Sequence, residues 1–166
     1  MDNLFNELPG KLESWDSRIT SAKKSYKMAQ TTEYRLDSEI YQENHSDNPS
    51  KDILLSLENQ RSEALKEVQE AQSVLMRILM ELKQCNSQID ENVRKIEQTV
   101  NGLIRIGSSS KYVRAGMSSS TVKSELQRMN SIILFYKESK DKIMELSYRC
   151  DPNAEEEEDL PKMKRL

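Results

Sequence analysis

The stretch that decides the fold lies at residues 51–106 and reads KDILLSLENQRSEALKEVQEAQSVLMRILMELKQCNSQIDENVRKIEQTVNGLIRI. When Leu54 is taken as an a position, apolar residues return at alternating steps of three and four. The a positions are Leu54, Arg61, Val68, Leu75, Leu82, Ile89, Ile96 and Leu103, and the d positions begin with Leu57, Ala64, Ala71, Ile78 and Cys85. This repeat predicts one helix over residues 49–106, about 87 Å long at 1.5 Å per residue.

The apolar stripe of this helix moves by one residue toward its end. The d positions become polar at Asn92 and Thr99, while the next positions supply Val93 and Val100. A straight helix drifts by about 20° per heptad against a seven-residue repeat, so the shift predicts a weakly supercoiled bundle. Arg61 interrupts the same stripe, either to set the register between helices or to reach water at a thin edge.

Two shorter helices are predicted on either side. Apolar residues spaced by three and four predict a helix over residues 9–43 that begins at Pro9, and residues 44–50 (NHSDNPS) have the composition of a turn with Asn48 and Pro49 starting the next helix. A third helix is predicted over residues 121–150. The remaining parts are an N-terminal segment at 1–8, a Ser/Gly-rich loop at 107–120 and a charged disordered tail at 151–166.

These lengths predict an all-α, elongated, antiparallel three-helix coiled-coil bundle with one very long central helix. Neither outer helix can cover the central one alone, so the two should overlap near residues 74–82 (VLMRILMEL), where apolar residues surround most of the helix. The cysteines should stay unpaired, with Cys85 inside the seam. The expected core comprises Trp15, Leu75, Ile78, Leu79, Leu82, Cys85, Met129 and Ile133.

Composition argues against several classes of function. The formal charge of −3, with both signs interspersed, predicts no nucleic-acid partner, and no apolar run is long enough for membrane insertion. With one histidine, no metal-ligand spacing and no phosphate-binding glycine motif, we expect no catalytic site, metal, cofactor or small-molecule substrate. Two cysteines in 166 residues do not resemble a disulfide framework, so a cytoplasmic protein is expected.

The sequence therefore favours a coiled-coil scaffold or adaptor subunit that binds a helical protein partner or a second copy of itself. The alternative is a secretion-associated, chaperone-like hairpin that carries a larger helical cargo. Leu65, Val93 and Val100 add apolar surface beyond the seam, which predicts a further helix on that flank. Two other sets of residues have either a docking or a purely structural role. They are Tyr112, Val113 and Met117 in the loop, and Leu4 and Phe5 near the N-terminus.

Overall fold

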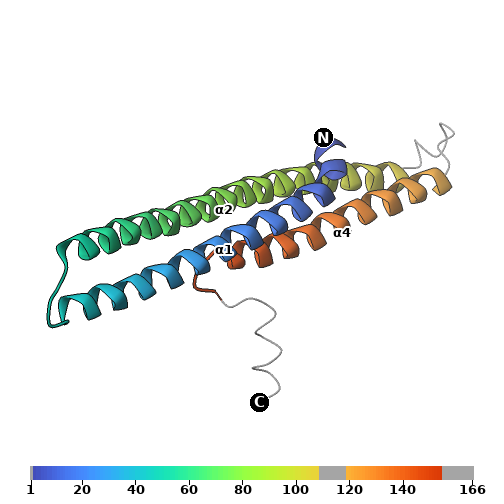
Figure 1. Cartoon of the computed structure of the whole chain (residues 1–166). Helices are drawn as coiled ribbons and strands as arrows, with labels where there is room; N and C mark the ends of the chain where they lie inside the picture. The colour runs from blue at the N-terminus through green and yellow to red at the C-terminus, as the bar shows by residue number, and fades with distance from the viewer. Residues whose placement is uncertain (1, 109–118, 155–166) are drawn as a thin grey trace, which may run out of the picture. The chain divides into compact units, whose positions relative to one another are not determined.

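Three helices make up nearly all of the described structure. The computed structural model describes residues 2–108 and 119–154, and its helices are α1 (Asp2–Asn44), α2 (Lys51–Ser108) and α4 (Ser119–Arg149), shown in Figure 1. They contain 43, 58 and 31 residues, and no strand occurs in the described ranges. The predicted all-α class with one very long central helix is confirmed.

Helix α1 begins earlier than predicted, because residues 2–8 are helical and Pro9 lies inside the helix. A proline there has no N–H to donate to the carbonyl of Phe5, four residues earlier, which normally costs stability. Packing offsets this cost, since Leu8 is fully buried and the Phe5 ring lies 4.7 Å from that of Phe135. The predicted helix start at Pro9 was therefore wrong, because tertiary contacts outweigh one missing backbone hydrogen bond.

The turn between α1 and α2 places the helix cap at Ser50, two residues after the predicted Asn48. The Ser50 hydroxyl accepts a hydrogen bond from the Ile53 N–H at 3.4 Å, and the Ser50 carbonyl accepts one from the Leu54 N–H at 3.1 Å. The Ser50 N–H in turn donates to the Glu43 carboxylate at 2.8 Å. A hydrogen bond between the Ser50 N–H and the Glu43 side chain thus links the end of α1 to the start of α2.

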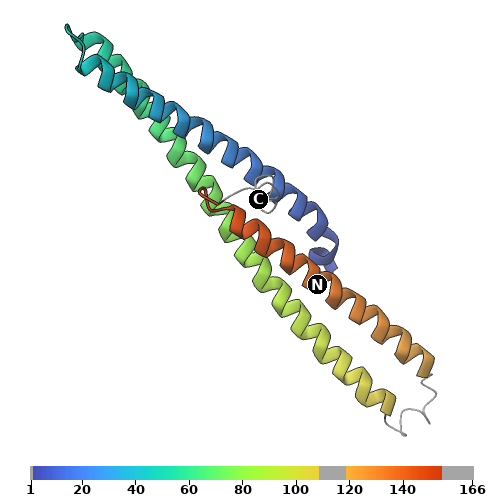
Figure 2. The same cartoon turned by 90° about the horizontal axis from the view of Figure 1, so that it is seen from below.

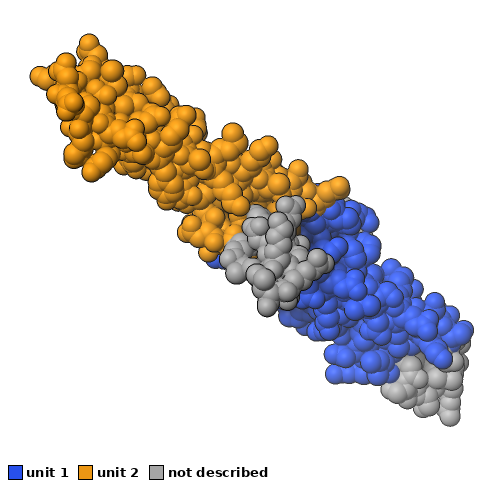
Figure 3. All heavy atoms as spheres, turned by 60° about the horizontal axis from the view of Figure 1, so that its bottom comes forward, with its two compact units in different colours: residues 1–12, 81–145 blue, residues 13–80, 146–166 orange. Residues whose placement is uncertain are grey.

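Contacts divide the chain into two compact units, coloured separately in Figure 3. Unit 1 contains Met1–Leu12 and Glu81–Glu145, and unit 2 contains Glu13–Met80 and Leu146–Leu166. Helices α1 and α2 both contribute to each unit.

In unit 1 the start of α1 packs with α2 and α4. The Phe5 ring lies 4.7 Å from Phe135 and 6.0 Å from Tyr136. The Tyr136 hydroxyl accepts a hydrogen bond from the Asn92 amide at 3.4 Å, so Asn92 makes a polar contact between α2 and α4. Three helices therefore meet in unit 1 around Tyr136, one of the most completely buried side chains.

In unit 2 α1 packs along α2. Tyr26 and Ala29 of α1 form a buried cluster with Val68 and Ala71 of α2, while further along α1 Asp37 pairs with Arg61. Partner numbers fall as α1 numbers rise, the order expected for neighbouring helices that run in opposite directions.

The last residues of α4 also pack against α1 in unit 2, as Figures 1 and 2 show. Arg149 pairs with Asp16 and donates to the Thr20 hydroxyl at 2.9 Å. The buried Lys23 ammonium donates to the Ala154 carbonyl at 3.0 Å. The segment that directly follows α4 is thus hydrogen-bonded to α1.

Two predictions are corrected here. The three-helix contact is not confined to residues 74–82, since it also reaches Asn92. The reason is that α1 starts seven residues earlier than predicted. Within 74–82, moreover, Met76 and Met80 are exposed. The predicted tail is also too long at its start, because Ala154 is buried; residues 155–166 lie outside the described part.

Candidate partner-binding surface

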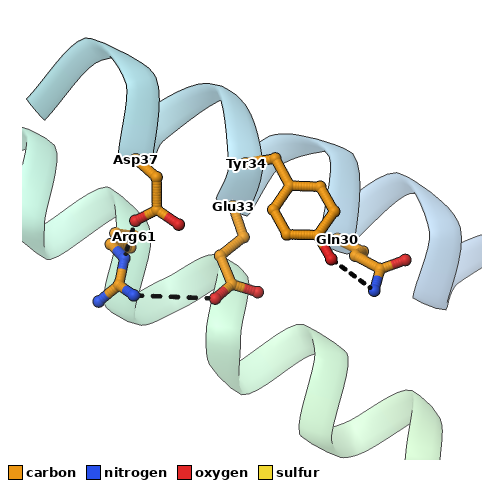
Figure 4. A network of polar contacts seen from close by, with 5 residues as sticks. All are labelled: Gln30, Glu33, Tyr34, Asp37 and Arg61. Carbon is orange, nitrogen blue, oxygen red and sulfur yellow. Dashed lines mark hydrogen bonds and ion pairs between the residues drawn. The ribbon is translucent and has the colours of Figure 1, made fainter. Parts of the chain in front are cut away.

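The most distinctive polar group on the α1/α2 pair of unit 2 is centred on Arg61, as Figure 4 shows. Its guanidinium pairs with the Asp37 carboxylate and lies 3.9 Å from the Glu33 carboxylate. All three side chains are partly exposed, so these ion pairs contribute at most about 1 kcal/mol each. They join one turn of α2 to α1, while the Arg61 side chain, 43% exposed, also reaches water, so both roles considered for Arg61 stay predictions.

Next to this group, α1 presents Tyr34 and α2 presents Leu65. The Tyr34 hydroxyl accepts a hydrogen bond from the Gln30 amide at 3.2 Å, while 62% of the residue remains exposed. Leu65 lies one helical turn after Arg61 and is 37% exposed. We name this surface the Arg61 flank. It comprises Gln30, Glu33, Tyr34, Asp37, Arg61 and Leu65.

The other residues predicted to bind a partner differ from Leu65. Val93 and Val100 are partly buried, and they lie in unit 1, where α4 pairs with α2 through Lys140 and Asp90. Phe5 packs on Phe135 within the molecule, and Leu4 borders a shallow hollow between α1 and α2 in unit 1. Tyr112, Val113 and Met117 lie outside the described residues.

Most of the predicted core residues are inaccessible to solvent. Trp15, Leu75, Ile78, Leu82 and Cys85 are buried, whereas Leu79, Met129 and Ile133 are half-exposed. Burial raises the pKa of the Cys85 thiol, although the nearby Lys11 opposes this shift. Burial also raises the pKa of the Cys150 thiol against the charges of Arg149 and Lys23. Both cysteines are free, and their neutral thiols are poor nucleophiles at neutral pH.

The described residues contain no cluster of three or more His, Cys, Asp or Glu side chains that could hold a metal ion. The single histidine, His45, is exposed in the turn after α1, where its ring stacks 4.1 Å from the Tyr41 ring. Its Nδ1 lies 2.9 Å from the Tyr41 carbonyl oxygen. His45 thus contacts its own helix end in the described structure.

Sequence reasoning missed three features of unit 2. Tyr34 was not singled out, although an exposed tyrosine between polar helix residues is a recognisable signal. The buried Lys23 could not be found, because its partner is a backbone carbonyl 131 residues away. A third feature is a row of serines on α1, Ser17, Ser21 and Ser25, whose spacing of four was visible in the sequence.

Comparisons with known proteins add no functional information. No family model, no curated protein and no solved structure matches this chain. Across the described helices, none has both the length and the apolar character needed to cross a bilayer.

Proposed function

We propose that this protein is a non-enzymatic helical scaffold or adaptor subunit and that a helix of a partner protein binds the Arg61 flank of unit 2. The observation that carries this proposal is the 37% exposure of Leu65 beside the ordered Arg61 group. Val93 and Val100 in unit 1 are partly buried and so more covered than Leu65.

A pair of helices buries its a and d positions but leaves the flanking positions in water. In unit 2 the described part of α4 contributes only Leu146–Arg149, and Arg149 contacts Asp16 and Thr20 of α1, well before Tyr34. A partner helix placed along the Arg61 flank would remove the remaining apolar surface of Leu65 from water, at about 25 cal/mol per Å².

The flank also has the chemistry of a selective surface. Tyr34 offers a large ring of low conformational entropy, and tyrosine is common among residues that dominate binding energies. Arg61 is already held by two carboxylates, so a partner meets a charged group whose position is set before binding. Apolar contact would supply affinity, and the fixed polar groups would select the partner helix and its register.

Site-specific photo-crosslinking in cells that make the protein tests this proposal. A photoreactive residue at position 65 should yield adducts with a helical segment of another protein. The matched control is Lys66, which is exposed on the neighbouring position of α2 and points about 100° away around the helix axis. We expect position 66 to give few adducts, and Leu65→Glu to reduce recovery of the same partner while the helical circular-dichroism signal is retained. Equal labelling at both positions, or none at 65, would rule out the Arg61 flank as the binding surface.

A further inference from the structure

The side of the α1/α2 pair opposite the Arg61 flank carries a groove. Its volume is about 640 Å³, and small side chains form much of its lining. We name it the serine groove; its lining includes Ser17, Arg18, Ser21, Ala22 and Ser25 of α1 and Ala71 and Val74 of α2. Met28 borders the same groove and is 62% exposed. Small side chains allow another helix backbone to approach closely, and Met28 adapts readily to the surface that covers it.

The two edges of the groove carry opposite charge. On α2, exposed glutamates recur at spacings of four and three and form an acidic strip, which consists of Glu63, Glu67 and Glu70. The strip ends there, because the exposed residue seven positions after Glu70 is Arg77. On α1, two exposed cations form a basic strip, which consists of Lys24, seven residues after Ser17, and Arg35, seven residues after Met28. Arg35 also lies 4.0 Å from the Glu39 carboxylate. Within the described part of the chain, none of the three glutamates takes part in an ion pair.

We infer that the serine groove is a dimer interface and that its occupant is the same groove of a second copy of this chain. A two-fold axis makes a surface meet itself, so the surface must be complementary to its own rotated image. An axis parallel to the helices lays α1 of one copy over α2 of the other, and the basic strip of each copy then faces the acidic strip of its partner.

The positions of the charged residues along the helix axis, called their levels below, agree with this arrangement. Tyr26 and Ala29 pack with Val68 and Ala71, and Asp37 pairs with Arg61. By the same spacing, Lys24 lies within one turn of the level of Glu70, and Arg35 lies at about the level of Glu63. An axis parallel to the helices keeps these levels, so Arg35 of each copy faces Glu63 of the other, while Lys24 lies between the levels of Glu70 and Arg77.

The alternative two-fold axis, perpendicular to the helices but in the interface, gives the opposite result. It lays α1 over α1 and α2 over α2, so cations meet cations and glutamates meet glutamates. The charges therefore select parallel copies, while Met28, Ala71 and Val74 supply the apolar contact. This inference concerns a different surface from the Arg61 flank and does not depend on the partner proposed for it.

Charge reversal with mixing tests the dimer. Sedimentation velocity should show that the wild-type protein dimerises. Both Lys24→Glu/Arg35→Glu and Glu63→Lys/Glu70→Lys should raise the dissociation constant by roughly tenfold or more, because each makes like strips meet. Mixing these two variants in equal amounts should restore association to about the wild-type level, because opposite strips then face each other again. Circular dichroism should show that both variants stay helical.

The matched control for Glu63→Lys/Glu70→Lys is Glu58→Lys/Glu97→Lys, which changes the net charge by the same amount through exposed positions of α2 away from the acidic strip. We expect it to dimerise like the wild type. A wild-type protein that stays monomeric at about 100 μM overturns the inference. A dimer that both reversal variants leave intact also overturns it, as does a mixture that fails to associate. None of these outcomes changes the expected labelling at Leu65, so the two proposals can fail separately.

Discussion

Truncation of Leu75 should destabilise the protein far more than truncation of Leu65, although both leucines lie on α2 in unit 2. Leu75 is 1% exposed, whereas Leu65 is 37% exposed. Leu75→Ala removes three buried carbon atoms, a loss of about 2.4 kcal/mol at about 0.8 kcal/mol per methylene group. The cavity raises the total to about 3–4 kcal/mol.

Leu65→Ala should cost about 1.5 kcal/mol, because only about two thirds of the same surface is buried and water can fill the space. Urea unfolding followed by circular dichroism at 222 nm measures both losses, and the dependence on urea should stay unchanged. A difference of about 2 kcal/mol is therefore expected between two identical substitutions ten residues apart. Equal losses would show that Leu75 does not lie in a closed core and would refute the packing described for unit 2.

Three further outcomes follow from the structure. A double-mutant cycle with Arg61→Ala and Asp37→Ala should give a coupling of about 0.2–1 kcal/mol that weakens in 1 M salt, and an unchanged coupling would mean that the pair is not electrostatic. Pro9→Ala should raise the free energy of unfolding by up to about 3 kcal/mol by restoring an N–H donor inside α1; a loss of stability would contradict the helix through this position. Because burial raises the pKa of Cys85 and Cys150 above 9.0, the thiols should react slowly with a disulfide reagent at pH 8 and rapidly after unfolding in urea. The same shifts stabilise the folded state below pH 9, and this stabilisation should be lost as the pH rises through the folded pKa values.

Helix type and approximate extent could be read from the sequence because they depend on local spacing. The heptad repeat through Leu75, Leu82 and Ile89 required a long helix, and all three residues are buried. The start of α1 could not be read in the same way. Pro9 is a local signal for a helix start, but the contact of Phe5 with Phe135 joins residues 130 positions apart and keeps the preceding turns helical.

The candidate surfaces also have some features that the sequence shows and others that only the structure shows. Leu65 was visible in the sequence because an apolar residue beside a seam already departs from the two-helix pattern. Its distinction from Val93 and Val100 was not visible, because exposure depends on which helices lie beside each residue. The partners of Arg61, Asp37 and Glu33, were likewise not visible, because they lie on a different helix.

The sequence by itself determined that the chain forms three helices, one of them very long, because helix formation follows from spacing within a few turns. Only the tertiary structure decided which flanks are exposed among the described residues. The serine groove needs Ser21 and Ala71 side by side, and Lys23 needs the carbonyl of Ala154. Such pairs are set by the packing of helices distant in the chain, and no local pattern encodes them.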